Sequence, residues 1–381
     1  MRFFQWGLFL AAGVLFSCCN PSHRTDSTTQ PRERWTTEQA NDWYRGEGWL
    51  VGANYIPSTA INQLEMWQAA SFDTVTIARE LGWAQDLGMN VMRVYLHDLL
   101  HHTDSSGLYQ RMSAFLSIAQ QHHIKILFVL FDSCWDPFPH AGKQRAPRPH
   151  VHNSGWVQSP GQVALKDSTQ YLRLERYVKG VVAHFASDER ILAWDIWNEP
   201  DNMNEVAYGN VEMPNKVEYV LPLLKRAFRW ARAAQPSQPL TTAIWKGDWS
   251  SDSMLRPIEQ WQLNESDIVS FHNYGPPGDL EKRIRQLQRY NRPLICTEYM
   301  ARPNGSTFQA CLPVGKTHRV GMINWGFVSG KTQTIYPWDS WTTTYQDEPP
   351  VWFHDIYRKT GTPYRAAEVA FIKAMTTNGT H

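Results

Sequence analysis

Short apolar runs alternate with longer segments of helical periodicity along the chain from residue 49 onward. The helical segments repeat apolar residues at three- and four-residue spacing, and the one at 72–88 ends in a glycine that favours helix termination. The apolar runs are nearly unbroken, as IKILFVLF at 124–131 illustrates. Such runs are typical of strands that are buried on both faces of a parallel sheet.

This alternation predicts a closed barrel of parallel strands. The expected strands occupy 49–56, 90–99, 124–131, 191–199, 239–245, 267–274, 293–299 and 320–328. The expected helices between them occupy 72–88, 108–123, 170–186, 216–234, 253–263, 280–291 and 307–318. Eight strand–helix repeats without an intervening linker predict an α/β fold with a single (β/α)8 TIM-barrel domain over 49–381. No GxGxxG motif follows the first strand, which disfavours an open dinucleotide-binding sheet.

The N-terminus carries the pattern of an export signal. An apolar run that ends at Phe16 is too short to span a bilayer and is typical of a signal peptide, expected over 1–17. The LFSC sequence that ends at Cys18 resembles a bacterial lipobox, which implies lipidation of Cys18 and export to the cell envelope, on its periplasmic or outer surface. Plain secretion, with cleavage after Cys19 or Asn20, is the alternative.

Residues 18–48 are expected to form a tether and N-terminal extension. Within them, 20–34 is polar and contains proline, which is typical of a flexible segment. The lipid on Cys18 would then be the only attachment to the membrane.

The charge balance and the aromatic content narrow the class of molecule that the protein is expected to bind. Lys plus Arg number 37 and Asp plus Glu 36, so the net charge of +1 gives no reason to expect nucleic acid. The chain holds 18 Trp, 15 Tyr and 16 Phe, and flat aromatic faces stack on sugar rings as well as filling cores. As a group, these residues favour a carbohydrate site.

Cysteine and histidine spacing gives no sign of a metal or a cofactor. Three cysteines lie beyond the N-terminal region and form no CxxC motif, so we expect neither a zinc site nor a required disulfide. His97, His101 and His102 lack an accompanying HExxH-type carboxylate, although His97 could contact a sugar.

Two glutamates stand at strand ends. Glu199 closes the fourth expected strand in ILAWDIWNEP, and Glu298 closes the seventh in PLICTEYMAR. Active sites of (β/α)8 barrels lie where strands end, and strands four and seven face one another across the barrel mouth. Retaining glycosidases hold such a pair about 5–5.5 Å apart, one as acid/base and one as nucleophile.

Alternation of side chains along strands brings further groups to the same mouth. Arg93 and Tyr95 share one face of the second strand, His272 and Tyr274 share one face of the sixth, and Trp325 belongs to the inward set of the eighth. A cation at Arg93 would favour the ionised form of one glutamate and leave the other to carry the proton.

These motifs, in this order, resemble the clan A glycoside hydrolases, most nearly the family 5 cellulases and mannanases. The resemblance rests on WNEP, TEY, VMRVYL, FHNYG and INWG and covers about Trp49 to Lys373. It implies that Glu199 is the acid/base, that Asn198 bonds the sugar 2-hydroxyl and that Glu298 is the nucleophile.

The same resemblance assigns the supporting residues. Arg93 would lie close to the nucleophile, Tyr274 would hold it, and His272 would lie beside the site. Trp325 would form the floor of the sugar subsite at the scissile bond. Apart from the resemblance, Asp132 ends the third expected strand in FVLFDSCWD and is expected to contact the substrate together with Trp135.

Other candidates are weaker. Asp195 lies deeper in the fourth strand and is the less favoured carboxylate. The loops at 133–166 and 329–341 are expected to shape the substrate cleft. The second loop offers candidate outer sugar contacts at Lys331, Tyr336, Trp338 and Trp341.

The sequence therefore predicts a monomeric retaining β-glycoside hydrolase without a cofactor or metal. Its substrate would be a β-linked polysaccharide or oligosaccharide of the glucan, mannan or xylan type, cleaved by double displacement. Two alternatives stay open: a non-catalytic carbohydrate-binding lipoprotein, and an exo-acting relative of the β-mannosidase or β-galactosidase kind.

Overall fold

The computed structural model describes residues 1–3 and 30–377, and eight parallel strands form the centre of the folded unit. The strands are β1 (Val51–Asn54), β2 (Val91–Tyr95), β3 (Lys125–Asp132), β4 (Ile191–Asn198), β5 (Leu240–Thr241), β6 (Val269–His272), β7 (Leu294–Glu298) and β8 (Gly321–Asn324). Hydrogen-bonded neighbours follow the order β5-β4-β3-β2-β1-β8-β7-β6. A bridge between Ile244 and Phe271 joins the two outer strands, which confirms the (β/α)8 barrel.

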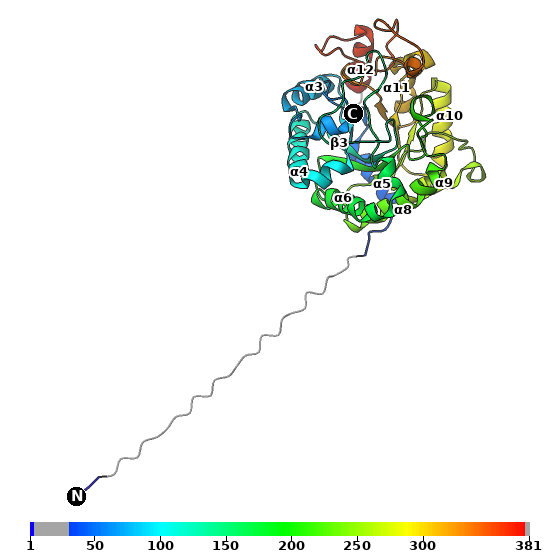
Figure 1. Ribbon diagram of the computed structural model, residues 1–381. Coiled ribbons are helices and arrows are strands. Elements are labelled where there is room, and N and C mark those ends of the chain that lie inside the picture. Colours follow the sequence, from blue (N-terminus) through cyan, green and yellow to red (C-terminus); the bar gives the residue numbers. More distant parts are fainter. Residues whose placement is uncertain (4–29, 378–381) are drawn as a thin grey trace. The chain divides into compact units, whose positions relative to one another are not determined.

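Helices surround the strands. They are α1 (Thr37–Glu47), α2 (Gln63–Trp67), α3 (Thr74–Asp86), α4 (Asp98–Gln121), α5 (Gln162–Lys166), α6 (Tyr171–His184), α7 (Glu205–Tyr208), α8 (Lys216–Ala233), α9 (Pro257–Glu265), α10 (Pro277–Leu287), α11 (Phe308–Thr317) and α12 (Ala366–Thr377). Figure 1 shows α3, α4, α6 and α8 to α12 as a ring around the barrel. Among the described helices, none is long and apolar enough to cross a membrane.

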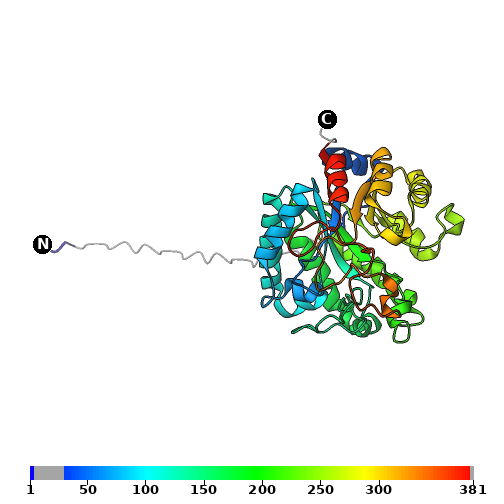
Figure 2. The same cartoon turned by 90° about the horizontal axis from the view of Figure 1, so that it is seen from above.

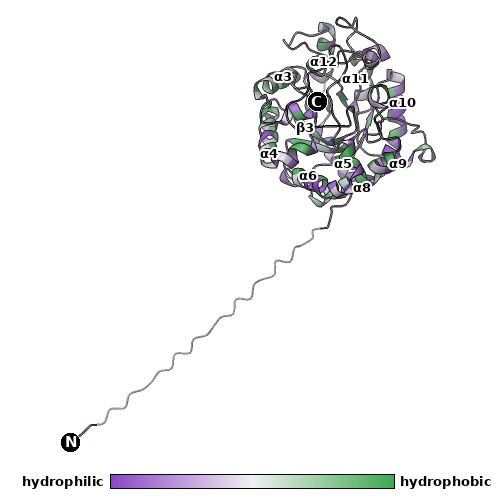
Figure 3. Cartoon of the chain, in the orientation of Figure 1, coloured by the Kyte–Doolittle hydropathy of each residue, from purple (hydrophilic) through white to green (hydrophobic). Residues whose placement is uncertain are grey.

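The layer between strands and helices forms the main hydrophobic core. Helix α8 shows how the sequence builds it, because its buried Val220, Leu224, Ala227 and Ala231 recur at three- and four-residue spacing. Polar and apolar residues accordingly intermingle along the ring helices in Figure 3. Burial of each large apolar side chain stabilises the fold by roughly 1.5–3 kcal/mol.

Helix α1 covers the barrel end opposite the active face. A capping box between Thr36 and Gln39 starts it, and its residues Trp43 and Tyr44 pack on the apolar plug inside this end of the strands. In Figure 2 the dark-blue α1 lies at one end of the barrel and the orange segment near residue 340 lies at the other. The sequence does carry the capping-box spacing of Thr36 and Gln39, but we expected residues 18–48 to form a tether and extension and did not predict this helix.

The chain is already attached to the barrel ahead of α1. Arg32 pairs with Asp267 at 2.6 Å, and Nε of Arg34 donates to the Ser266 carbonyl at 2.9 Å. We expected flexibility through residue 34, so these contacts shorten the expected tether. Cys18 and all but the first three residues of the expected signal peptide lie outside the described residues.

Two elements differ in length from the expected ones. Strand β5 spans only Leu240–Thr241, because its pairing with β4 ends at Thr241 and its contact with β6 is the single bridge from Ile244 to Phe271. Helix α4 begins ten residues before the expected position. It continues across a kink at Asp104, a local feature that apolar periodicity does not predict.

Candidate active site

Glu199 lies in the turn that follows β4, where the chain leaves the barrel. Its φ is 42°, in the left-handed region that residues other than glycine seldom adopt. Ser133 Oγ donates to the carbonyl of Pro200 at 3.0 Å, and the Asn202 amide donates to the Glu199 carbonyl at 2.9 Å. Backbone strain of this kind persists where surrounding contacts fix it, which is common at active sites. Glu199 is 7% exposed and lines a cavity at the barrel mouth.

Glu298 is the last residue of β7 and lies in a nest of donors. Its Oε1 accepts from Arg93 Nη1 at 2.9 Å and from the Tyr95 hydroxyl at 3.0 Å. Its Oε2 accepts from the Tyr274 hydroxyl at 2.7 Å. Burial raises the pKa of both tyrosines well above the ordinary value, so each hydroxyl keeps its proton and donates. These contacts fix the carboxyl group of Glu298 in one orientation.

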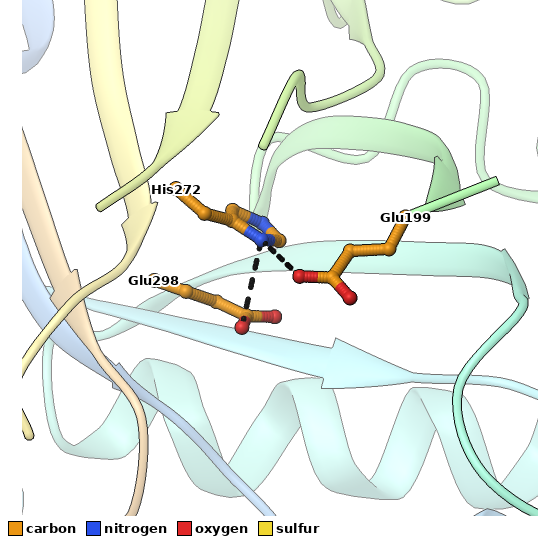
Figure 4. A group of neighbouring side chains, drawn as sticks. All are labelled: Glu199, His272 and Glu298. Atoms are coloured by element: carbon orange, nitrogen blue, oxygen red, sulfur yellow. Dashed lines mark hydrogen bonds and ion pairs between the residues drawn. The ribbon is translucent and has the colours of Figure 1, made fainter. Parts of the chain in front are cut away.

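His272 lies between the two glutamates, as Figure 4 shows. Its Nδ1 is 2.8 Å from Oε1 of Glu199 and 3.6 Å from Oε2 of Glu298. One ligand atom from each of the three residues lies within 4.8 Å of the others, a spacing that could also hold a metal ion. The two carboxylates are therefore close neighbours on one cavity, although 99 residues separate them in the chain.

The environment of Glu199 differs from that of Glu298. Its Oε2 accepts from Asn202 Nδ2 at 2.6 Å and from the Cys134 thiol at 3.3 Å. Burial raises the pKa of Glu199, but the hydrogen bond and charge of His272, with these two donors, outweigh that effect and lower the pKa below its ordinary value. Burial also raises the pKa of Cys134 well above its usual range, so the thiol keeps its proton and serves as a donor.

Arg93 connects the Glu298 side of the site to the Glu199 side. It is fully buried on β2, and besides Glu298 it donates to Asp195 at 2.7 Å and to Asn198 Oδ1 at 2.7 Å. Asn54 Oδ1 accepts a further bond at 2.8 Å. Asp195, the less favoured carboxylate, is fully buried beneath the cavity and acts on the site by holding the guanidinium.

Asp132 does not line the cavity, where we expected it to contact the substrate. It is 1% exposed and accepts from Asn198 Nδ2 at 2.9 Å and from Trp156 Nε1 at 2.7 Å. Burial raises the pKa of Asp132 to about 6. Asp132 thus orients the Asn198 amide from behind.

The cavity at the mouth has a volume of about 430 Å³ and a mixed aromatic and polar lining. Both glutamates, Asn198, Tyr274, Trp325 and Trp135 line it, as expected from the sequence. Its remaining lining residues are Cys134, His152, Asn153, Asn202, Met203, Asn204, Glu205, Val206, Trp245, Lys246 and Trp338.

The second long loop contributes less than expected. Trp338 lines the cavity, and Trp341 supports it by stacking on Trp135 with ring centroids 5.6 Å apart. Lys331 instead pairs with Glu65 at 2.6 Å, and Tyr336 is 5% exposed in a separate apolar cluster.

The three histidines near α4 do not share a site. His97 is buried against Asp98 at 3.3 Å, His101 bonds the Tyr109 hydroxyl at 2.7 Å, and His102 is exposed.

Several site residues were missed in the sequence. Tyr95 shares the inward face of the second strand with Arg93, so its hydrogen bond to Glu298 could have been predicted. Cys134 follows the end of β3 by two residues, a position that strand-end reasoning could have flagged. His152 and Asn153 lie in the middle of a long loop, where no local pattern marks them.

Three solved structures share the fold at low sequence identity. An alanine variant of GH5_18 from Streptomyces cattleya in complex with Manβ1-4GlcNAc is 12% identical, with a TM-score of 0.59 over 87% of this chain and 81% of that one. Exo-β-1,4-mannosidase Op5Man5 from Opitutaceae bacterium strain TAV5 is 18% identical, with a TM-score of 0.57 over 87% and 60%. An endo-1,4-β-D-mannanase from Thermotoga petrophila RKU-1 is 14% identical, with a TM-score of 0.51 over 86% and 99%.

A family model places the chain directly. The model described as cellulase (glycosyl hydrolase family 5) matches residues 83–342, a range that contains strands β2 to β8 and both glutamates. A search of curated proteins finds no match. The chain belongs to glycosyl hydrolase family 5 and is a glycoside hydrolase.

Proposed function

We propose that this enzyme is a retaining β-glycoside hydrolase with Glu199 as acid/base and Glu298 as nucleophile. The observation that carries the proposal is the short separation of the pair, since an oxygen of each carboxylate lies within 4.8 Å of the other. Retaining enzymes hold their carboxyl groups about 5–5.5 Å apart, whereas inverting enzymes separate the groups by about 6.5–9.5 Å to fit a water. Two carboxylate oxygens this close to each other favour retention. The different partners of the two glutamates support different roles.

In the first step, a Glu298 oxygen attacks the anomeric carbon while the bond from that carbon to the leaving oxygen breaks. Glu199 gives its proton to the leaving oxygen, and the alcohol departs. Arg93, Tyr95 and Tyr274 hold the attacking carboxylate, so little reorganisation is needed as its charge is consumed. The product of this step is a glycosyl ester on Glu298.

In the second step, Glu199 takes a proton from water, whose oxygen attacks the same carbon as the ester bond breaks. The two displacements restore the original anomeric configuration. His272 takes part in the proton balance, because Nδ1 can donate to ionised Glu199 or accept from its protonated form at 2.8 Å.

The proposed substrate is a β-linked mannose-containing saccharide, with glucan and xylan chains as the alternatives. Solved structures of similar fold include mannanases, a mannosidase and a complex with Manβ1-4GlcNAc. The aromatic lining of the cavity suits any β-linked sugar, so the preference for mannose rests on these structures.

The test is reducing-end release from β-mannan, cellulose-type glucan, mixed-linkage glucan and xylan, with wild type and Glu298→Ala side by side. We expect release by wild type alone, and proton NMR should show the first product with retained configuration. An inverted first product would overturn the retaining mechanism. Activity that survives in Glu298→Ala would overturn the nucleophile assignment.

We propose further that the mature enzyme is an exported lipoprotein that is attached to the membrane through a lipid on Cys18. It acts as a monomer, and its only substrate class is saccharides. The support is the lipobox-like LFSC sequence after an apolar run. Mass spectrometry of the mature N-terminus should show a diacylglyceryl or triacyl mass on Cys18. An unmodified N-terminus would overturn this assignment.

A further inference from the structure

The cavity that holds the two glutamates is open at one end and closed at the other. Val206 borders the open end and is 58% exposed, and the Lys246 side chain beside it is 34% exposed. His152 and Asn153 border the opposite end, and each is 1% exposed. The site is therefore a blind pocket and not a cleft that runs across the barrel mouth.

Three loops meet behind the closed end, and we call them the loop wall. They are the β1–α2 loop (55–62), the β3–α5 loop (133–161) and the β8–α12 loop (325–365). The backbone amide of Asn153 in the second loop donates to the carbonyl of Thr332 in the third at 2.8 Å. This backbone hydrogen bond holds the two loops against each other.

Side chains tie the same loops together. Trp341 Nε1 donates to the His152 carbonyl at 2.9 Å, which links the third loop to the second. Asn62 Nδ2 donates to the Gly155 carbonyl at 2.9 Å, which links the first loop to the second.

The first and third loops are in direct backbone contact. The Lys331 amide donates to the Ser58 carbonyl at 3.1 Å, and a Cβ added at Gly330 would lie 2.5 Å from the Ser58 Cα. Only glycine allows that approach without a shift of the backbone. The Lys331 side chain adds an ion pair with Glu65 at 2.6 Å. Among residues of these loops, including Asn153 and Thr332, lies a cavity of about 20 Å³, which is too small for a sugar residue. The loop wall therefore leaves no space for a saccharide chain to pass.

At the closed end, Asn153 has polar atoms without a protein partner, and His152 has one ring nitrogen that is free to accept. Both side-chain polar atoms of Asn153 are buried and lack a hydrogen-bond partner among the described residues. The Nδ1 of His152 donates to the Tyr336 carbonyl at 2.8 Å, which leaves Nε2 as an acceptor. Burial lowers the pKa of His152 to about 4, so the ring stays neutral and that acceptor persists. Unpaired buried polar atoms are costly unless a ligand satisfies them.

The positions of the two glutamates indicate which end of the cavity holds the leaving group and which holds the sugar that is attacked. Glu199, which protonates the leaving oxygen, follows β4, and the open end beyond it is bordered by Trp245 after β5. Glu298 ends β7, and the neighbouring strand β8 leads into Trp325 and the loop wall. The leaving group therefore occupies the open end. The sugar that is attacked lies between Glu298 and the wall.

We propose that the loop wall admits only one sugar residue beyond the scissile bond, so that the enzyme is exo-acting and releases a monosaccharide from the non-reducing end. Asn153 binds a hydroxyl of this terminal sugar, on the side where an internal residue would carry the next sugar. The inference rests on the proposed glycosidase function, because it uses the roles assigned to Glu199 and Glu298.

The first test follows the initial products from β-1,4-linked pentasaccharides of mannose, glucose and xylose that carry a label on the reducing end. We expect an unlabelled monosaccharide and a labelled tetrasaccharide to appear first. Labelled di- or trisaccharides among the earliest products would overturn exo action and leave the proposed glycosidase function intact. Cleavage of none of the three substrates would overturn both.

The second test compares aryl β-glycosides whose 4-hydroxyl is free or methylated. Wild type should cleave only the free form, and equal turnover of both forms would overturn the proposal. Asn153→Gly fits the left-handed φ of 47° at this position and should lower kcat/KM for the free form about tenfold, the effect of one lost hydrogen bond. Asn291→Gly is the matched control, because Asn291 has a similar φ of 50° and lies outside the cavity lining. An Asn153→Gly enzyme as active as this control would overturn the role of Asn153.

Discussion

The Nδ1 atom of His272 lies 2.8 Å from Oε1 of Glu199. At that distance the pair can share one proton, either as an ionised pair or as neutral imidazole and carboxylic acid. The donors around Glu199 lower its pKa, which favours the ionised pair before substrate binds. When the leaving oxygen approaches, it would receive the shared proton through Glu199. Glu199 would thus obtain its proton from His272 and not from bulk water.

The first prediction concerns pH. The neighbours of Glu199 lower its pKa, so we expect the alkaline limb of the kcat/KM profile to follow the loss of the proton that Glu199 gives to the leaving oxygen. His272→Asn keeps a donor near Glu199 but cannot titrate, so it should move the alkaline limb of the profile. It should also lower kcat by about 10²-fold for alkyl glycosides. Aryl glycosides with acidic leaving groups should be much less affected, and an unmoved alkaline limb would contradict the shared proton.

The second prediction uses Asp132, whose pKa burial raises to about 6. The pKa of an aspartic acid in the unfolded chain is about 3.9, so the folded chain binds the Asp132 proton more tightly than the unfolded chain does. The stabilising contribution is therefore complete below pH 3.9 and is lost as pH rises through 6, by up to about 3 kcal/mol. Urea unfolding at several pH values should show a smaller decline for Asp132→Asn than for wild type, and parallel declines would refute the assignment.

The activity of Asp132 variants gives a separate check on its position behind Asn198. Asp132 orients the side-chain amide of Asn198 at 2.9 Å, and Asn198 is expected to bond the 2-hydroxyl of the sugar. Asp132→Ala should therefore lower activity on a substrate that carries the 2-hydroxyl more than on its 2-deoxy analogue. A direct substrate contact would instead weaken binding of both substrates to a similar extent.

The third prediction concerns Arg93, which is fully buried between Asp195 and Glu298. Arg93→Met leaves two buried carboxylates without their cation and should reduce the free energy of unfolding by about 3–5 kcal/mol. Combining it with Asp195→Leu should recover part of that loss in a urea melt while activity stays low. No recovery in the double variant would show that the two residues act independently on stability.

The barrel could be predicted because its strands are buried on both faces. Strands β3 and β4 are eight residues long and six residues of each are apolar, so their ends were placed within about a residue or two. The length of strand β5 was overestimated, because its pairing with β4 ends at Thr241 although the apolar run continues. Helix α1 was missed because its stabilisation comes from a plug assembled from distant strands.

The two glutamates could be located for a geometric reason: parallel strands end at one face, so strand-end carboxylates must meet there. Asp132 met the same criterion, but its side chain points to Asn198 and Trp156 and not into the cavity. The direction of a side chain after a strand depends on the local turn, as the φ of 42° at Glu199 illustrates. His152 and Asn153 reach the cavity through contacts between loops almost two hundred residues apart, which no local pattern encodes.

The last prediction concerns metal ions at the catalytic pair. Glu199, His272 and Glu298 present three ligand atoms within 4.8 Å of one another, a donor set that zinc accepts. The proposed displacement needs both carboxylates free and uses no metal, so dialysis against EDTA should leave kcat/KM unchanged. Added Zn²⁺ should inhibit competitively and reversibly, because it would tie up the nucleophile and the acid together. The residual activity of His272→Asn should be less sensitive to Zn²⁺ than wild type, while the remote variant Asn291→Gly should match wild type. Loss of activity in EDTA that one metal restores would instead make the ion part of the catalyst.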